Sequence, residues 1–203
     1  MSGSPKQSKA SEQAAQMEQE RQAAIRETQG RVNAVFDNPR RARDISDFVS
    51  AVRSRALIDL DRQNTDAQRE LKFALARGGL SGGSVSVDQN RRLGDDYNRG
   101  LINVENRAQG AGSQLEAADQ DARSRLIQLA TSGLDATTAA SQAASSLRSN
   151  IGNAQAQAYG EQLGDQFANV GAFVKQRREE SARRQANRDA NYNLYGGGAA
   201  YGG

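Results

Sequence analysis

The sequence contains no cysteine, histidine or tryptophan, and it has only two prolines in 203 residues. Without cysteine and histidine, disulfides, cysteine nucleophiles, histidine general bases and nearly all zinc chemistry are excluded. We therefore expect no cofactor and no metal site. No window approaches 18 uncharged apolar residues, so no ordinary transmembrane helix is expected. The first ten residues also lack the apolar region of a secretory signal.

Large apolar side chains are scarce as well. Leu, Ile, Val and Phe together contribute 34 residues, whereas Ala contributes 33 and Gln 20. That content is below the level typical of a broad globular core, and the net charge of +3 is too small to indicate disorder. Strand-like alternation of polar and apolar residues is absent. The composition predicts an all-α protein whose long helices bury narrow seams against copies of themselves.

The N-terminal half of the chain carries clear helix boundaries. We expect residues 1–10 to be unfolded and residues 11–37 to form the first helix. Asn38 and Pro39 mark the next start, because Asn caps a helix and Pro suits its first position. Residues 38–84 then hold a helix that ends at Arg77 and a glycine-rich turn. This turn predicts an antiparallel helical hairpin, and its glycines are Gly78, Gly79, Gly82 and Gly83.

A long helical segment is expected over residues 85–190. Its start is marked by Ser86 and Gln89, which have the spacing of a capping box. From Leu93 to Ile151, apolar or small residues recur at a mean spacing of about 3.6 residues, the period of a straight α-helix. The stripe predicts one nearly straight helix about 95–100 Å long. A flexible Gly/Tyr-rich tail is expected over residues 191–203.

Residues 129–174 carry only four charged side chains. Small residues recur there at every fourth position, a spacing that lets two helix backbones approach closely and is common in membranes. The opposite face is apolar and suits either lipid or a protein core. The plainer alternative is an alanine-rich packing helix in a soluble assembly. The small face comprises Gly152, Ala156, Gly160, Gly164 and Ala168, and the apolar face comprises Tyr159, Leu163, Phe167, Val170 and Val174.

Residues 175–189 hold six basic and three acidic side chains, which equals the whole net charge of +3. A basic run beside a low-charge helix suits the anionic phosphates of lipid or DNA. The alternative is a solvated helix end. The candidate phosphate contacts are Lys175, Arg177, Arg178, Arg183 and Arg184.

Carboxylate pairs occur at Asp95-Asp96 and Glu179-Glu180. Neighbours in sequence point to different sides of a helix, whereas a cell-wall hydrolase needs two carboxylates facing one cleft. We therefore do not expect an enzyme.

The stretch ALARGGLSGGSVSVDQ, followed by a polar helix with YNRG and then Gln- and Ala-rich sequence, resembles the small internal virion proteins of short-tailed bacteriophages. The resemblance covers roughly residues 40–150. The residues that carry it most directly are Ala76, Arg77, Gly78, Gly79, Leu80, Ser81, Gly82, Gly83, Ser84 and Val85.

The resemblance implies a mostly helical DNA-ejection protein that leaves the virion before the genome. Copies would form a ring-shaped homo-oligomer in the host outer membrane, as the outermost section of a channel. The implied partners are other copies, other phage ejection proteins, outer-membrane lipid and the viral DNA that passes through. The implied location is the virion interior or tail before infection and the host cell envelope afterwards. The alternatives are a soluble virion structural protein of the head interior or head–tail connector and a nucleic-acid-packaging protein.

Overall fold

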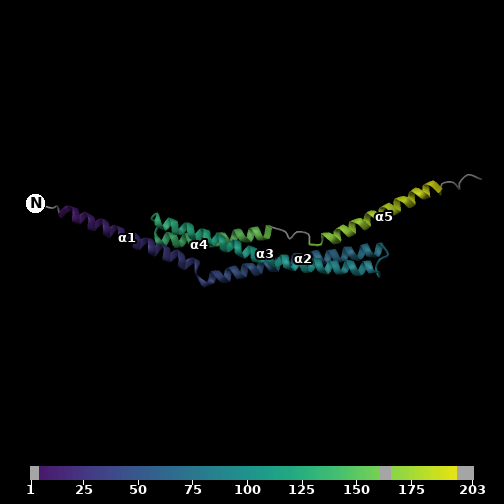
Figure 1. Ribbon diagram of the computed structural model, residues 1–203, viewed down its shortest axis with the longest axis horizontal. Helices are drawn as coiled ribbons and strands as arrows, with labels where there is room; N and C mark the ends of the chain where they lie inside the picture. The colour runs from purple at the N-terminus through teal and green to yellow at the C-terminus, as the bar shows by residue number, and fades with distance from the viewer. Residues whose placement is uncertain (1–4, 161–165, 196–203) are drawn as a thin grey trace, which may run out of the picture. The chain divides into compact units, whose positions relative to one another are not determined.

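The computed structural model describes residues 5–160 and 166–195, with side chains for residues 9–160 and 166–188. The described chain is all-α, as the composition predicts, and contains no strand. Its helices, shown in Figure 1, are α1 (Pro5–Phe36), α2 (Pro39–Arg77), α3 (Ser84–Thr131), α4 (Ala136–Gly160) and α5 (Ala168–Tyr195).

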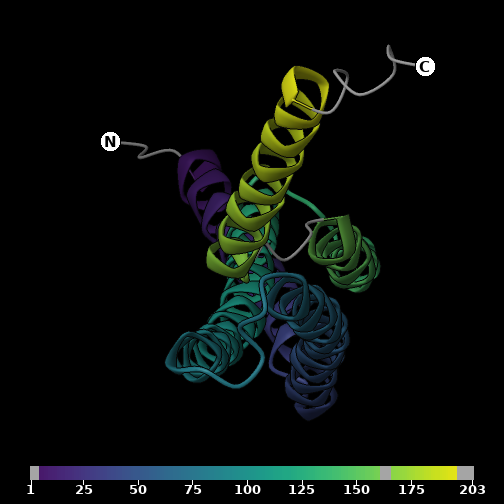
Figure 2. The ribbon, with the colours of Figure 1, turned by 90° about the vertical axis from the view of Figure 1, so that its right-hand side faces the viewer.

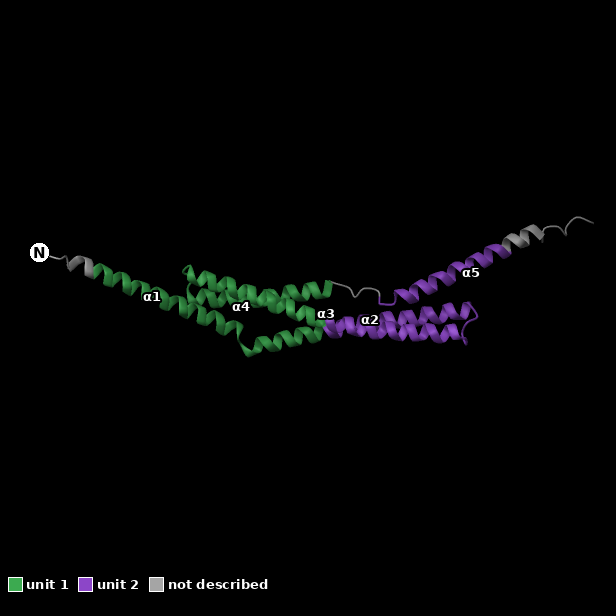
Figure 3. Cartoon of the chain, viewed as in Figure 1, with its two compact units in different colours: residues 1–52, 107–161 green, residues 53–106, 162–203 purple. Residues whose placement is uncertain are grey.

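The chain divides into two compact units, coloured separately in Figure 3. Unit 1 comprises residues 1–52 and 107–161, and unit 2 comprises residues 53–106 and 162–203. The helices α2 and α3 therefore contribute one part to each unit. The helices α1 and α4 belong to unit 1, and α5 belongs to unit 2.

The boundary between α1 and α2 lies where the sequence predicts it. The Asn38 side-chain oxygen accepts a hydrogen bond from the Arg40 backbone N–H at 2.9 Å, and Pro39 is the first residue of α2. The start of α1 differs from the prediction, because the helix begins at Pro5 and not at Ser11. Pro5 is again at a first helical position, where its missing N–H costs nothing. Residues 1–4 lie outside the described residues.

The turn after α2 is built as the glycine-rich sequence predicts. Gly79 has a φ of +66°, the left-handed conformation that ends many helices. The Leu80 N–H donates to the Leu75 carbonyl at 2.9 Å, and the Gly79 N–H donates to the Ala76 carbonyl at 3.1 Å. These two bonds form a Schellman motif, in which the last carbonyls of the helix are satisfied. The next helix begins at Ser84, so Ser86 lies inside α3 and does not cap it.

The prediction of one straight helix through residue 151 is wrong. The helix α3 ends at Thr131, and Gly133 adopts a φ of +102°. A second Schellman motif forms there, with the Leu134 N–H bonded to the Leu129 carbonyl at 3.1 Å. Asp135 then caps α4 by accepting hydrogen bonds from the backbone N–H groups of Thr137 and Thr138. The periodic stripe missed this break because it counted Gly133 as one more small residue.

A second break separates α4, which ends at Gly160, from α5, which begins at Ala168. The expected continuous segment over residues 85–190 therefore consists of three helices. At its other end α5 extends to Tyr195, into the predicted tail, while residues 196–203 lie outside the described residues.

Unit 1 packs α1, α4 and the adjoining parts of α2 and α3 around two small apolar clusters. One brings Val32 of α1 and Leu126 of α3 against Ala139 and Ala143 of α4. The other joins α2 to α3, with α4 packed against it, and is formed by Phe48, Val52, Ala108 and Leu115. Alanine at the α4 positions keeps these seams narrow.

Unit 2 is a helical hairpin with α5 packed against it. Figures 1 and 2 show α2 and α3 side by side, joined by the glycine-rich turn. Their antiparallel register brings the Tyr97 hydroxyl to 2.8 Å from the Asp61 carboxylate, and Arg53 to 2.7 Å from Glu105. The larger buried side chains of this core are Leu60, Leu71, Leu75, Leu93, Val104, Phe167, Val170 and Val174.

Two glycines of α3 allow close approach to α2. A Cβ added at Gly100 would lie 2.4 Å from Leu60 Cδ1, and one added at Gly112 would lie 2.7 Å from Val49 Cγ2. A methyl group at either position would overlap its neighbour, so the Leu60 or Val49 side chain would have to shift to accommodate it.

Candidate functional site

The small residues of α4 form an exposed face. Gly152, Ala156 and Gly160 are all exposed, and a Cβ added at Gly152 or Gly160 would meet nothing within 4 Å. The buried face of α4 is a different one, formed by Ala139 and Ala143 with Ile151, Ala154 and Ala158 partly buried. Gly164 lies outside the described residues, and Ala168 is an exposed residue of the next helix.

The predicted apolar face is distributed between two helices. Tyr159 is an exposed residue near the end of α4. By contrast, Phe167, Val170 and Val174 are buried in the core of unit 2. Leu163 lies outside the described residues. The small and apolar faces predicted for one helix are thus divided between α4 in unit 1 and, in unit 2, α5 together with Phe167 just before it.

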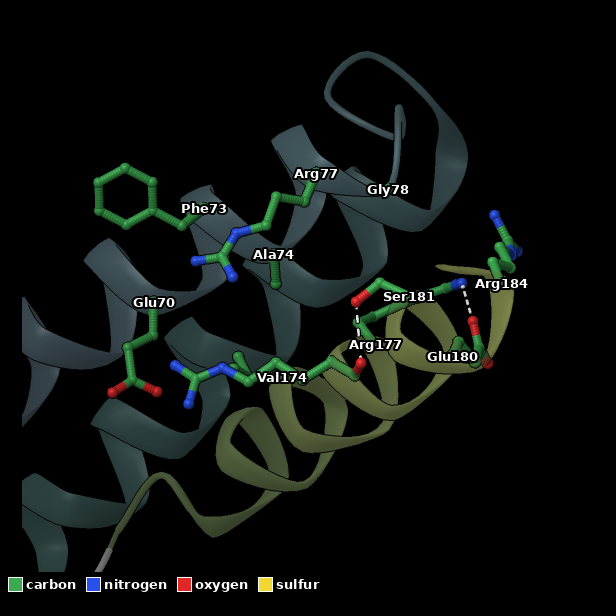
Figure 4. A pocket seen from close by; sticks show the side chains of 11 residues that line it. Glu70, Phe73, Ala74, Arg77, Gly78, Val174, Arg177, Glu180, Ser181 and Arg184 are labelled. Carbon is green, nitrogen blue, oxygen red and sulfur yellow. Dashed lines mark hydrogen bonds and ion pairs between the residues drawn. The ribbon is translucent and has the colours of Figure 1, made fainter. Parts of the chain in front are cut away.

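The basic run of α5 contributes to a cleft in unit 2, seen from close by in Figure 4. The cleft lies between the C-terminal end of α2 and the middle of α5 and encloses about 80 Å³. Of the predicted phosphate contacts, three arginines line it, while Lys175 and Arg183 are exposed elsewhere on α5. The lining side chains are Glu70, Phe73, Ala74, Arg77, Val174, Arg177, Arg178, Glu180, Ser181 and Arg184.

The charges of this cleft are partly paired. Arg177 Nη1 lies 2.7 Å from Glu180 Oε2, and the Arg177 guanidinium stacks over the Phe173 ring at 5.3 Å from its centroid. Figure 4 shows the Arg77 side chain extending toward Phe73, whose own ring is 55% exposed. Four arginines and two glutamates give the lining a net charge of +2. The cleft therefore combines a basic surface with an apolar floor at Ala74 and Val174.

Unit 1 contains a buried ion pair that sequence reasoning missed. Arg41 binds both oxygens of Asp119, with Nε–Oδ2 at 2.6 Å and Nη2–Oδ1 at 2.9 Å, and the two side chains are only 6% and 9% exposed. The Asn150 amide also donates to Asp119 Oδ1 at 2.9 Å. One carboxylate therefore joins α2, α3 and α4.

Unit 2 contains a second buried carboxylate, at Asp96, which is 2% exposed. Its Oδ1 pairs with Arg99 of the same helix and accepts a long 3.4 Å hydrogen bond from Asn169 of α5. Its Oδ2 is buried without a hydrogen-bond partner among the described residues. The sequence offered one signal for both sites, since Asp96 and Asp119 fall close to the apolar stripe of α3.

Among the residues with described side chains, no three acidic residues cluster in a way that would hold a metal ion. The described helices also include none that is long and apolar enough to span a membrane. Comparison with known protein families, curated proteins and solved structures finds no match.

Proposed function

We propose that this chain is a phage virion protein that is ejected into the host cell envelope. There, copies of it oligomerise into a ring-shaped channel, in the outer membrane, for genome translocation. The proposal joins the resemblance around the glycine-rich turn to one structural observation, the exposed small-residue face of α4.

The α4 face supports self-association in a specific way. Among the described residues, no side chain covers the backbone at Gly152 or Gly160, and Ala156 is exposed between them, on a helix whose opposite face is already buried within unit 1. Helices that meet through such residues approach closely and gain backbone-to-backbone contacts. A copy of the chain that used this face would not disturb the existing core, so assembly and folding are separable.

The chemistry of the chain also suits passage through a phage tail. The seams of unit 1 are narrow and include several alanines. Refolding after passage requires neither disulfide nor metal because the chain lacks cysteine and histidine. Binding to other copies would then add the stability that narrow seams do not provide.

The test is to add the purified full chain to lipid vesicles made from outer-membrane lipids. Electron microscopy should show rings in the bilayer, and an entrapped dye should leak. Particles that stay in solution, with vesicles that remain sealed, would favour the soluble virion structural protein. Binding to DNA that persists without any vesicle effect would favour the packaging protein.

The matched variants are Gly152→Leu and Gln157→Leu, both on exposed positions of α4. Gly152→Leu should abolish ring formation, because a large side chain prevents close backbone approach. Its folding should be unharmed or improved by about 1 kcal/mol, since Leu is the better helix former. Gln157→Leu adds equal hydrophobic surface and should leave rings intact. Normal rings with Gly152→Leu would refute close packing at this face.

A further inference from the structure

Within the described part of the chain, residues 12–24 of α1 are not covered by any other helix. Every side chain from residue 12 to residue 24 is exposed, including Met17 at 65%. Isolated helices of this length are marginal in water, and most helical stability in proteins comes from packing. The segment bears Glu12, Glu18, Glu20 and Arg21, a net charge of −2. Residues 12–24 are thus an uncovered acidic stretch of α1 with one large apolar side chain, preceded by the basic residue Lys9. Glu18 pairs with Arg21 within this stretch, so Glu12 and Glu20 are the carboxylates that can face a basic partner.

The cleft of unit 2 has the complementary character. Its floor is apolar, its net charge is +2, and Phe73 stands exposed at its edge. Within the described part of the chain, Arg77, Arg178 and Arg184 form no ion pair, since Arg177 alone among the lining arginines is matched, with Glu180. Three guanidinium groups are therefore available to a negatively charged partner.

The two units also differ in how many helices they assemble. Unit 1 combines segments of four helices, α1 to α4, whereas unit 2 combines segments of three, α2, α3 and α5. A groove between two helices of a three-helix group is the position that a fourth helix occupies in a four-helix bundle. The cleft between α2 and α5 is such a groove.

We propose that this cleft receives residues 12–24 of α1 from a second copy of the chain. Met17 of that copy enters the enclosed space, whose volume of about 80 Å³ equals that of two or three water molecules. Glu20, one helical turn after Met17, then lies near Arg77 and Arg178. This contact joins different surfaces of two copies, so its repetition generates a ring where the rotation closes. The inference rests on the proposed self-assembly and names an interface for it.

A bare phosphate group fits the cleft less well than an acidic helix does. Glu70 and Glu180 line the cleft and repel an anion of high charge density. A helix that carries an apolar side chain and separate carboxylates can contact both the apolar floor of the cleft and the arginines that form no ion pair.

The decisive experiment is a charge exchange measured by sedimentation of the full chain. Variant A carries Arg77→Glu and Arg178→Glu, and variant B carries Glu12→Arg and Glu20→Arg. Each variant alone places like charges at the contact and should weaken self-association by about tenfold or more. An equal mixture restores opposite charges at every contact, so association should return to near the wild-type level.

The control variant carries Lys175→Glu and Arg183→Glu, two exposed changes on α5 outside the cleft. It alters the net charge as much as variant A and should associate normally. A mixture of A and B that remains as weak as either variant overturns the docking proposal. So does a wild-type chain that is monomeric at micromolar concentration.

Cysteine cross-linking identifies the occupant, because the natural chain has no cysteine. A Met17→Cys chain mixed with a Phe73→Cys chain should form a disulfide-linked dimer upon oxidation. A disulfide that forms only within single chains carrying both changes would show that α1 of the same chain fills the cleft, and it would overturn the proposal. Loss of DNA binding by variant A without restoration in the A and B mixture would assign the cleft to phosphate instead.

The vesicle assay separates this proposal from the proposed function. If variants A and B each still form rings and release dye, the channel function stands and the docking contact is wrong. If rings are lost in A and in B but return in their mixture, the channel function and the docking contact are both supported.

Discussion

Units 1 and 2 pack different parts of the same two helices, α2 and α3. They differ in how completely a buried carboxylate of α3 is hydrogen-bonded. In unit 1, Asp119 accepts three hydrogen bonds from Arg41 and Asn150. In unit 2, Asp96 is equally buried, but its charge partner Arg99 is 66% exposed and one carboxylate oxygen has no hydrogen-bond partner among the described residues.

The difference shows two ways of attaching a further helix to an antiparallel pair. The helix α4 is held in unit 1 by apolar contacts and by the satisfied Asp119 network. The helix α5 is held in unit 2 by Val170 and Val174 and by Phe167 just before it. Gln166 adds hydrogen bonds to Asn103 at 2.6 Å and Gln63 at 3.3 Å, and Asn169 makes a long contact with Asp96. A buried polar group that lacks partners opposes burial, so the Asp96 contact attaches α5 less firmly than the Asp119 network attaches α4.

The largest expected effect is from Asp119→Leu in unit 1. This change leaves the Arg41 guanidinium, 6% exposed, buried without its carboxylate. Breaking such a pair from one side typically costs about 3–5 kcal/mol. Urea unfolding followed by circular dichroism should show that loss. A change of less than about 1 kcal/mol would mean that Arg41 reaches water and that the network is not a structural requirement.

The matched change in unit 2 is Asp96→Leu. It removes a carboxylate that is incompletely satisfied, and the Arg99 left behind is already solvated. Replacement of a poorly paired buried charge by an apolar side chain of similar volume is often neutral or stabilising. We expect a shift within about 1 kcal/mol of zero. A loss as large as that of Asp119→Leu would erase the contrast between the two units.

An effect smaller than that of Asp119→Leu is expected from Gly100→Ala, compared with Gly94→Ala in the same helix and unit. The new methyl group at residue 100 overlaps the fully buried Leu60, whereas the one at residue 94 meets nothing within 4 Å. Overpacking costs about 1–3 kcal/mol, and both changes share the helix-propensity gain of about 1 kcal/mol. The free energy of unfolding of Gly100→Ala should therefore lie about 1–3 kcal/mol below that of Gly94→Ala. Equal values would show that Leu60 moves aside freely.

The smallest effect is expected in unit 1, in how the stabilisation by the Asp135 cap at the start of α4 depends on pH. Hydrogen bonds from Thr137 and Thr138 lower the pKa of Asp135 well below its ordinary value. The stabilisation by this cap is thus fully present above the unfolded pKa, near 4, and is lost as the pH falls through the lowered folded pKa. The melting temperatures of wild type and Asp135→Ala should differ at pH 7 and converge in strong acid.

Asp135→Asn serves as the control for this titration, because Asn caps a helix nearly as well but carries no charge. Its melting temperature should follow that of the wild type at pH 7. A difference between wild type and Asp135→Ala that stays constant from pH 7 into strong acid would rule out the ionised cap as its source.

The sequence by itself determined the helical class and the ends that depend on local chemistry. Asn38 and Pro39 start α2 where they stand, and the glycines after Arg77 end it, because caps and left-handed turns involve only neighbouring residues. The buried positions of α2 follow in the same way. Val52, Ala56, Leu60 and Leu71 recur at helical spacing, and all are buried.

The element that each helix face packs against, and therefore the side chains that are buried there, follow from the tertiary structure. Periodicity counts Gly133 as one more small residue, although there the chain turns so that α4 can return against α1. Periodicity likewise cannot distinguish Gly112 from Gly110. An added Cβ at Gly112 would overlap Val49 of α2, whereas one at Gly110 would have no neighbour within 4 Å. The burial of Asp96 and Asp119 and the convergence of Arg77 with Arg177 and Arg178 depend on helices distant in sequence. The spacing of residues specifies which side chains share a face, but only packing determines what that face meets.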